Sequence, residues 1–212
     1  FFDDTNGSKT TRYGVALDQA ITPKIHVGAE LSRRDVLRPI NRFISNEEGT
    51  AIIDKRVVNE KRKEDLHRAY LYWAPTDQLA LTAEYFLERI GRSGPPGTIG
   101  PNDVTELTTH RLPLGISYFH TSGFFSGMKA TYFNQDVESR DRGDSSGTED
   151  FWIIDAAIGY RLPQRFGILT LGAENLLDNE FRFQDTRFNS NEPIPPLLVP
   201  DRLVSIKFTL AF

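Results

Sequence analysis

The stretch RLVSIKFTLAF, residues 202–212, closes the sequence and decides the fold. Small or polar residues alternate there with large apolar ones, and the even-numbered positions are Val204, Ile206, Phe208, Leu210 and Phe212. A period of two predicts a β-strand with one apolar face and one polar face. Taken alone, the stretch leaves open whether the apolar face meets a protein core or lipid.

The same alternation recurs along the chain, in segments separated by turn residues. We expect about nine strands in all, in segments near 12–18, 25–32, 66–73, 79–88, 111–118, 127–133, 153–160, 167–174 and 202–212. In the third segment Arg68 would be costly toward lipid. Ala69, Leu71 and Trp73 are therefore expected on the apolar face.

The composition excludes several classes of protein. The chain has 25 Lys and Arg against 29 Asp and Glu, a formal net charge of -4, whereas nucleic-acid-binding surfaces are basic. It has no run of apolar residues long enough for a transmembrane helix. Membrane barrels escape that test because their alternating strands average to a polar composition. The chain has no cysteine, so disulfides and thiolate metal sites are excluded.

The predicted connections alternate between short and long. Short turns are expected near Pro23, Pro75, Ser122 and Pro163, and long loops at 33–65, 89–106, 134–150 and 178–201. Outer-membrane barrels have this asymmetry, with short periplasmic turns and longer extracellular loops. A soluble β-sandwich does not require it.

Aromatic and charged residues also follow the pattern of a barrel. Aromatic residues occupy two levels, near the short turns (Trp73, Tyr118, Phe124, Phe166) and near the loops (Tyr13, Tyr85, Tyr132, Trp152). Such girdles mark the two membrane interfaces. The polar face carries charges that a dry core does not accept without partners, namely Glu30, Glu84, Lys129, Asp155, Glu174 and Lys207. We predict an all-β, antiparallel, transmembrane β-barrel of the outer-membrane type; a soluble β-sandwich is the alternative.

The topology indicates that residues 1–212 form only part of such a barrel. If the short turns are periplasmic, the last strand ends on the periplasmic side. Counting back nine strands from that end places the start of the first strand on the extracellular side. Bacterial single-chain barrels have an even number of strands. We therefore expect the chain to be the C-terminal portion of a larger barrel domain.

The C-terminal region resembles the TonB-dependent outer-membrane receptors. In that family the penultimate strand ends in an Asn-Leu-Phe-Asp-like motif followed by an aromatic residue, and a Pro-Gly-Arg-like corner precedes the last strand. The positions that match are Asn175, Leu176, Asp178, Phe181, Pro200 and Arg202. The sequence departs from the family at Leu177, where an aromatic residue is usual, and at Asp201, where Gly is usual.

The resemblance implies a 22-stranded barrel in the outer membrane of a Gram-negative bacterium. It implies TonB-dependent uptake of a scarce ligand, such as a siderophore-iron complex, cobalamin or a glycan. The family's plug domain and TonB box lie outside residues 1–212. Phe208, Leu210 and Phe212 resemble the C-terminal signal read by the barrel-assembly machinery. The expected partners are thus that machinery, the TonB system, outer-membrane lipid and lipopolysaccharide, with no nucleic acid.

Two other functions remain open at this point. One is a passive porin or polysaccharide-export barrel without energy coupling. The other is a structural or adhesive outer-membrane barrel. Candidate ligand contacts lie where strands enter the long loops and within the last loop: Arg33, Arg34, Arg38, Arg89, Arg92, Phe181, Phe183 and Phe188. The arginines could attract an anion or form a solvated rim that contacts lipid phosphates. The phenylalanines could line a vestibule or pack the loop down.

No catalytic constellation is expected. The four histidines are scattered, without the spacing of metal ligands. A triad of Ser117 with His110 or His120 fails, because the serine and each histidine differ in parity and face apart on a regular strand. We expect no enzymatic activity, no cofactor and no metal.

Overall fold

The structure is a computed structural model of the 212-residue chain. It describes residues 6–45, 52–95, 98–100, 103–140, 146–184, 186 and 201–210. The side chains of residues 42–45, 52, 53 and 165 are not among those described.

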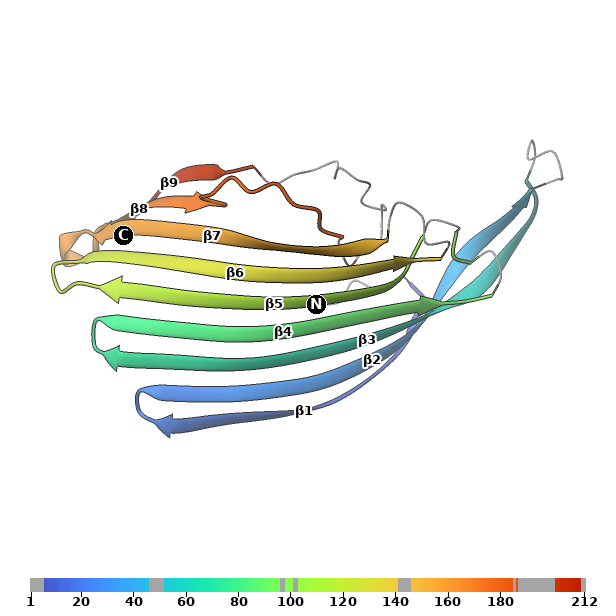
Figure 1. The fold of residues 1–212 in the computed structure, drawn as a ribbon, viewed down its shortest axis with the longest axis horizontal. Coiled ribbons are helices and arrows are strands. Elements are labelled where there is room, and N and C mark those ends of the chain that lie inside the picture. Colours follow the sequence, from blue (N-terminus) through green and yellow to red (C-terminus); the bar gives the residue numbers. More distant parts are fainter. Residues whose placement is uncertain are drawn as a thin grey trace.

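Nine β-strands follow one another in the same order in the chain and in the sheet (Figure 1). Each strand pairs antiparallel with the next. The prediction of an all-β antiparallel fold of nine strands is confirmed. The sheet is not closed, and β1 and β9 form its two edges. The strands are β1 (Lys9–Thr22), β2 (Ile25–Ser45), β3 (Ile52–Thr76), β4 (Leu79–Ser93), β5 (Val104–Phe119), β6 (Phe124–Ser139), β7 (Gly147–Arg161), β8 (Gly167–Glu174) and β9 (Leu203–Leu210).

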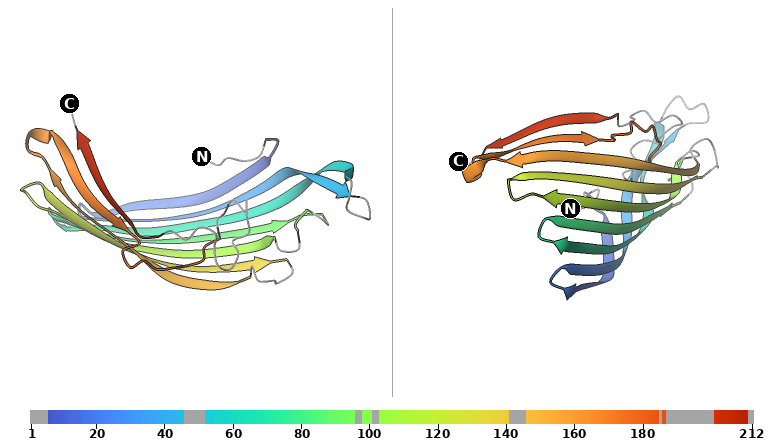
Figure 2. Two further views of the ribbon diagram at one scale, coloured as in Figure 1. Left: turned by 90° about the horizontal axis from the view of Figure 1, so that it is seen from above. Right: turned by 60° about the vertical axis from the view of Figure 1, so that its left-hand side comes forward.

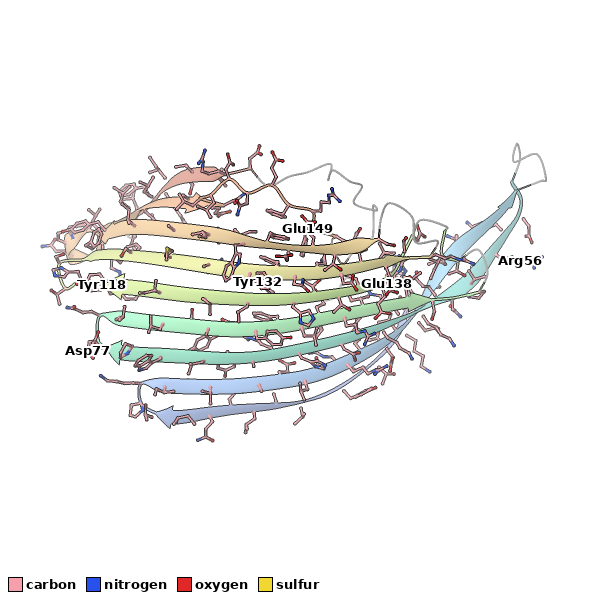
Figure 3. All side chains as sticks on the ribbon, in the orientation of Figure 1. Arg56, Asp77, Tyr118, Tyr132, Glu138 and Glu149 are labelled. Carbon is pink, nitrogen blue, oxygen red and sulfur yellow. The ribbon has the colours of Figure 1, made fainter. Side chains whose placement is uncertain are left out.

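The sheet is strongly curved, and its tight turns all lie at one end (Figures 1 and 2). Two-residue connections join β1 to β2 and β3 to β4, and a short 3-10 turn, η1 (Pro163–Arg165), lies between β7 and β8. Asp77 and Tyr118 mark this end, whereas Glu138 and Glu149 lie toward the other (Figure 3). The short connections therefore fall where the sequence predicts them.

The register of the ladders separates the side chains onto two unlike faces. On β6 and β7, Met128 pairs with Ala156 on one face and Lys129 with Asp155 on the other. We call the first the outer face; it carries Val15, Leu17, Leu71, Trp73, Met128, Trp152, Ile158, Leu171, Val204, Ile206, Phe208 and Leu210, all exposed. We call the second the inner face; it carries Arg12, Glu30, Arg68, Glu84, Lys129, Asp155 and Lys207.

The inner face lies on the inside of the curve. Side chains from six successive strands, β1 to β6, line a single cavity on this face. Arg68 points there and binds Glu84 (Nη2–Oε2, 2.8 Å), while Leu71 and Trp73 lie on the outer face. The predicted orientation of the third strand agrees with this arrangement.

The loop predicted at 33–65 is largely strand instead, and strand residues also occupy both ends of the loops predicted at 89–106 and 134–150. β2 continues to Ser45 and β3 begins at Ile52, so this hairpin extends past the rest of the sheet (Figure 1). The charged residues suit a ladder because opposite charges face each other across it. Ion pairs join Arg33 to Asp65 (3.7 Å) and Arg34 to Glu64 (2.9 Å). Sequence reasoning treated the charges one at a time and missed this pairing.

Glycine allows a close approach on the inner face of β7. A Cβ atom at Gly159 would meet the ring of Phe125 and would lie 2.7 Å from the backbone oxygen of Leu169. The oxygen belongs to the neighbouring strand β8 and cannot move without disturbing the ladder. At Gly127 on β6, the nearest atom to a Cβ would be the Ser117 hydroxyl, at 3.5 Å.

We expect Gly159→Ala to lower the free energy of unfolding of the intact protein by about 1–3 kcal/mol, the usual cost of overpacking. Gly127→Ala, the matched control, should change it by well under that amount. Urea titrations followed by tryptophan fluorescence measure both. Equal effects of the two substitutions would contradict the close approach at Gly159.

Candidate functional site

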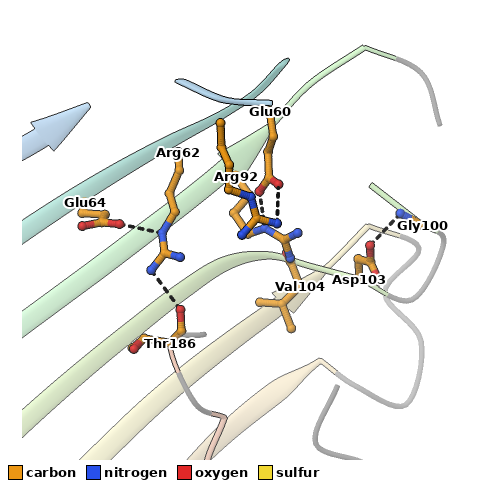
Figure 4. Close-up of polar contacts among 9 residues, drawn as sticks. Glu60, Arg62, Glu64, Arg92, Gly100, Asp103, Val104 and Thr186 are labelled. Atoms are coloured by element: carbon orange, nitrogen blue, oxygen red, sulfur yellow. Dashed lines mark hydrogen bonds and ion pairs between the residues drawn. The ribbon is translucent and has the colours of Figure 1, made fainter. Parts of the chain in front are cut away.

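Six charged side chains form a network on the inner face, toward the end of the sheet away from the tight turns. Figure 4 shows four of them, Glu60, Arg62, Glu64 and Arg92. Glu60 accepts a hydrogen bond from Arg92 Nε (2.6 Å) and forms an ion pair with Arg38 (3.3 Å). Glu64 accepts one from Arg34 Nη1 (2.9 Å) and forms an ion pair with Arg62 (2.6 Å). Both carboxylates are buried, at 2% and 4% exposure. We call these residues the arginine–glutamate network: Arg34, Arg38, Glu60, Arg62, Glu64 and Arg92.

The strand register explains why these residues meet. Arg34 lies opposite Glu64, Arg38 opposite Glu60, and Arg62 opposite Arg92. All have even numbers, and residues two apart on a strand share a face. Two buried carboxylates between four guanidinium groups satisfy the rule that buried charges need partners.

Arg62 joins the network to a distant part of the chain. Its Nη2 donates a hydrogen bond to the backbone oxygen of Thr186 (2.9 Å). Burial lowers the pKa of Arg62, and the neighbouring Glu64 opposes that effect. The guanidinium remains charged because the ordinary pKa of arginine lies far above neutrality.

After β8 the chain turns onto the inner face, and we call residues 175–184 the strap. Asn175 and Asp178 have left-handed backbone conformations, with φ of 48° and 58°. The Asn175 side chain donates to the backbone oxygen of Asn179 (3.0 Å) and accepts from its N–H (3.1 Å). Asp178 Oδ1 accepts a hydrogen bond from the backbone N–H of Arg202 (3.0 Å). These contacts set the direction in which the strap leaves the sheet.

The strap is packed onto β6 and β7 by aromatic rings and by one glutamine pair. Phe181 stacks on Phe151 with ring centroids 4.2 Å apart, and Phe183 meets the edge of Phe133 at 5.7 Å. The backbone N–H of Gln184 donates to Gln135 Oε1 (2.7 Å), and Gln135 Nε2 donates back to the Gln184 backbone oxygen (3.1 Å). The strap therefore has a defined position over the inner face.

A cavity of about 280 Å³ opens on the inner face beside the strap. Phe183 and Phe133 border it, and Phe86 lines it. The guanidinium carbons of Arg111 and Arg68 lie 4.3 Å and 5.3 Å from the centroid of the Phe86 ring. We call this the inner-face cavity; it combines aromatic surface with charged groups, as ligand sites commonly do.

The structure divides the arginines proposed from sequence between the two faces. Arg34, Arg38 and Arg92 belong to the arginine–glutamate network on the inner face. Arg33 and Arg89 lie on the opposite face, where they pair with Asp65 and Glu106. Phe181 packs on Phe151 and Phe183 on Phe133. Phe188 lies outside the described residues.

Sequence reasoning did not single out Glu60, Arg62, Glu64, Phe86 or Arg111. The first three lie in the segment predicted as the loop 33–65. These three residues have even numbers, as Arg34 and Arg38 do, so on continuous strands they can lie on one face. That pattern is the signal from which the network could have been predicted. Phe183 borders the cavity and contacts Phe133 on β6. No pattern in the sequence indicates that contact.

The residues that carry the family resemblance fall in four groups. Asn175, Asp178 and Arg202 make the turn contacts described above, and Phe181 packs inward. Leu176 is exposed, as are Phe208 and Leu210 on the outer face of β9. Pro200 and Phe212 lie outside the described residues.

Comparisons with protein-family models, curated proteins and solved structures returned no match for this chain. Within the described ranges, no group of three or more His, Asp or Glu side chains is placed to hold a metal ion. No helix in the same part of the chain is long and apolar enough to cross a membrane.

We expect Glu64→Gln to lower the free energy of unfolding of the intact protein by about 3–5 kcal/mol, because it leaves Arg34 and Arg62 without their buried carboxylate. Asp65→Asn is the matched control, since Asp65 pairs with Arg33 at a partly exposed position on the outer face. Exposed pairs contribute about 1 kcal/mol or less. Denaturant titrations of both variants provide the comparison, and a Glu64→Gln effect as small as the control's would contradict the account of the network.

Proposed function

We propose that this chain forms part of the wall of a transmembrane β-barrel in the outer membrane of a Gram-negative bacterium. We further propose that the barrel belongs to a TonB-dependent receptor that takes up a scarce ligand. The observation that carries the first step is the segregation of the two faces across all nine strands. The second step rests on the resemblance of the C-terminal region to that family.

The exposed apolar residues support contact with lipid. The outer face presents large apolar side chains such as Ile206 (76% exposed), Leu17 (68%) and Val15 (67%). Soluble proteins rarely expose continuous apolar patches above a few hundred Å². A β-sandwich would cover such a face with a second sheet, and no described residue does so here.

The spacing of the aromatic levels fits a bilayer. Phe124 and Tyr132 lie eight positions apart on β6, as do Trp152 and Tyr160 on β7. At about 3.3 Å per residue, eight positions span about 26 Å along a strand. A strand tilted by about 40° then spans about 20 Å of the membrane normal, near the height of the apolar band of such barrels.

The polar inner face supports a water-filled or plugged lumen. Lys129 and Asp155 form an ion pair there at 2.9 Å, and the lysine side chain is 56% exposed. In lipid every backbone polar group needs a partner, so the open edges at β1 and β9 require further strands. A larger barrel, of 22 strands in the family, would supply them, together with a plug and a TonB box.

Three observations bear on the alternatives. A passive porin needs an open lumen, whereas the strap here folds onto the inner face through Phe181, Phe183 and Gln184. The turn built by Asn175 and Asp178 corresponds to the motif that suggested the receptor family. Exposed Phe208 and Leu210 on β9 are available to the barrel-assembly machinery and to lipid.

Ile206→Arg should impair insertion into the outer membrane by about 2–4 kcal/mol, the cost of an arginine facing lipid near the bilayer midplane. Thr209→Arg, on the inner face of the same strand, should have a mild effect. Folding of the intact protein into lipid vesicles, followed by its shift in electrophoretic mobility, measures both. Equal losses would contradict the assignment of the two faces.

The transport step is tested by uptake in cells that carry the intact protein. The probes are a radiolabelled ferric siderophore, cyanocobalamin and a maltodextrin. We expect uptake of at least one probe to require both this protein and a functional TonB. Uptake that persists without TonB, or rapid swelling of protein-containing liposomes in a small sugar, would favour the passive porin instead.

A further inference from the structure

Two side chains of opposite charge in the inner-face cavity, Arg111 and Glu88, form no ion pair in direct contact with a described residue. Arg12 binds Glu30 (3.1 Å) and Arg68 binds Glu84 (2.8 Å). The Arg111 guanidinium lies over the ring of Phe86, and it attracts the Glu88 carboxylate without a hydrogen bond between them. The cavity thus holds one cation and one anion that attract each other without being in direct contact.

The register brings these two groups to the same place. Arg111 lies opposite Phe86, and Glu88 lies opposite Thr109, so Arg111 and Glu88 are diagonal neighbours on β5 and β4. Diagonal neighbours on one face are about 7–8 Å apart. An arginine stacked on an aromatic ring still presents its N–H donors in the plane of the guanidinium. Arg111 therefore offers hydrogen-bond donors to the cavity while Phe86 holds it in place.

The rest of the cavity suits an aromatic body. Phe86, Phe133 and Phe183 border it, on β4, β6 and the strap. Its volume of about 280 Å³ is nearly twice the cavity of about 150 Å³ that holds a benzene molecule. A ring system with a short polar chain fits that space.

We infer that the inner-face cavity binds a small aromatic zwitterion, of the class of the aromatic amino acids. The ligand carboxylate binds Arg111, the ammonium group binds Glu88, and the ring lies among Phe86, Phe133 and Phe183. The inference deepens the proposed function and rests on it for the route by which a ligand reaches the inner face.

A ligand with a single charge fits less well. A ligand with a carboxylate but no ammonium group leaves Glu88 without a contact and is repelled by it. A ligand with an ammonium group but no carboxylate leaves Arg111 without a contact and is repelled by it. Glu88 is half-buried, and leaving such a group unsatisfied beneath a ligand costs more than the bond itself contributes. The arrangement therefore selects for both charges at once.

Binding is measured by isothermal titration calorimetry on the purified intact protein in detergent micelles. The probes are tryptophan, indole-3-propionate, which lacks the ammonium group, and tryptamine, which lacks the carboxylate. We expect tryptophan to bind at least about tenfold more tightly than either analogue. Equal binding of the three, or no binding of tryptophan, would overturn the inference whatever the variants do.

Two substitutions assign the roles separately. Arg111→Gln should abolish the preference for tryptophan over tryptamine, and Glu88→Gln the preference for tryptophan over indole-3-propionate. Arg89→Gln, on the opposite face of β4, is the matched control and should preserve both preferences. An unchanged preference in a folded Arg111→Gln or Glu88→Gln variant would contradict the assigned contact.

The inference and the proposed function fail separately. Absence of tryptophan binding leaves membrane insertion and TonB-dependent uptake of another probe unaffected. If the protein binds tryptophan but its uptake of the probes does not depend on TonB, the binding-site inference stands and the proposal of a TonB-dependent receptor fails.

Discussion

The constraint on which the structure depends is the register of its eight ladders. Because side chains alternate with a period of two, a slip of one residue would move the inner-face charges of that strand to the outer face. Met128 would then exchange places with Lys129, opposite Ala156 and Asp155 on β7. Each strand is thus held in register by both faces at once, which is why the separation of apolar and polar side chains persists from β1 to β9.

Charge compensation extends this rule beyond the apolar part of the sheet. Past Leu31 the strands β2 and β3 lose most of their outer apolar residues, yet they continue as a ladder because arginine faces glutamate or aspartate on both faces. In the arginine–glutamate network, Arg62 donates a hydrogen bond to the backbone oxygen of Thr186. The strap, which precedes Thr186 in the sequence, borders the inner-face cavity. The fold, the network and the cavity therefore form one connected arrangement, in which cross-strand pairs position a segment far away in the sequence.

Periodicity was sufficient to predict what depends on neighbouring residues. The nine strands, their tight turns and the inward orientation of Arg68 follow from alternation and turn chemistry. Features that depend on pairing between strands could not be predicted in this way. Arg33 and Arg34 look equivalent in the sequence, but one pairs on the outer face and the other is buried against Glu64. The contact of Gln184 with Gln135 joins residues 49 positions apart, and nothing in the local sequence of either residue indicates the other.

The central claim, that the outer face meets lipid and the inner face does not, is tested most directly on β9. The natural chain has no cysteine, so single cysteines placed in turn at positions 203–210 of the intact protein can carry a spin label. In lipid vesicles, the account predicts that accessibility to oxygen and to a water-soluble nickel complex alternates with a period of two. Oxygen should collide preferentially with labels at 204, 206, 208 and 210. Labels that are equally accessible to the nickel complex at all eight positions would contradict the claim.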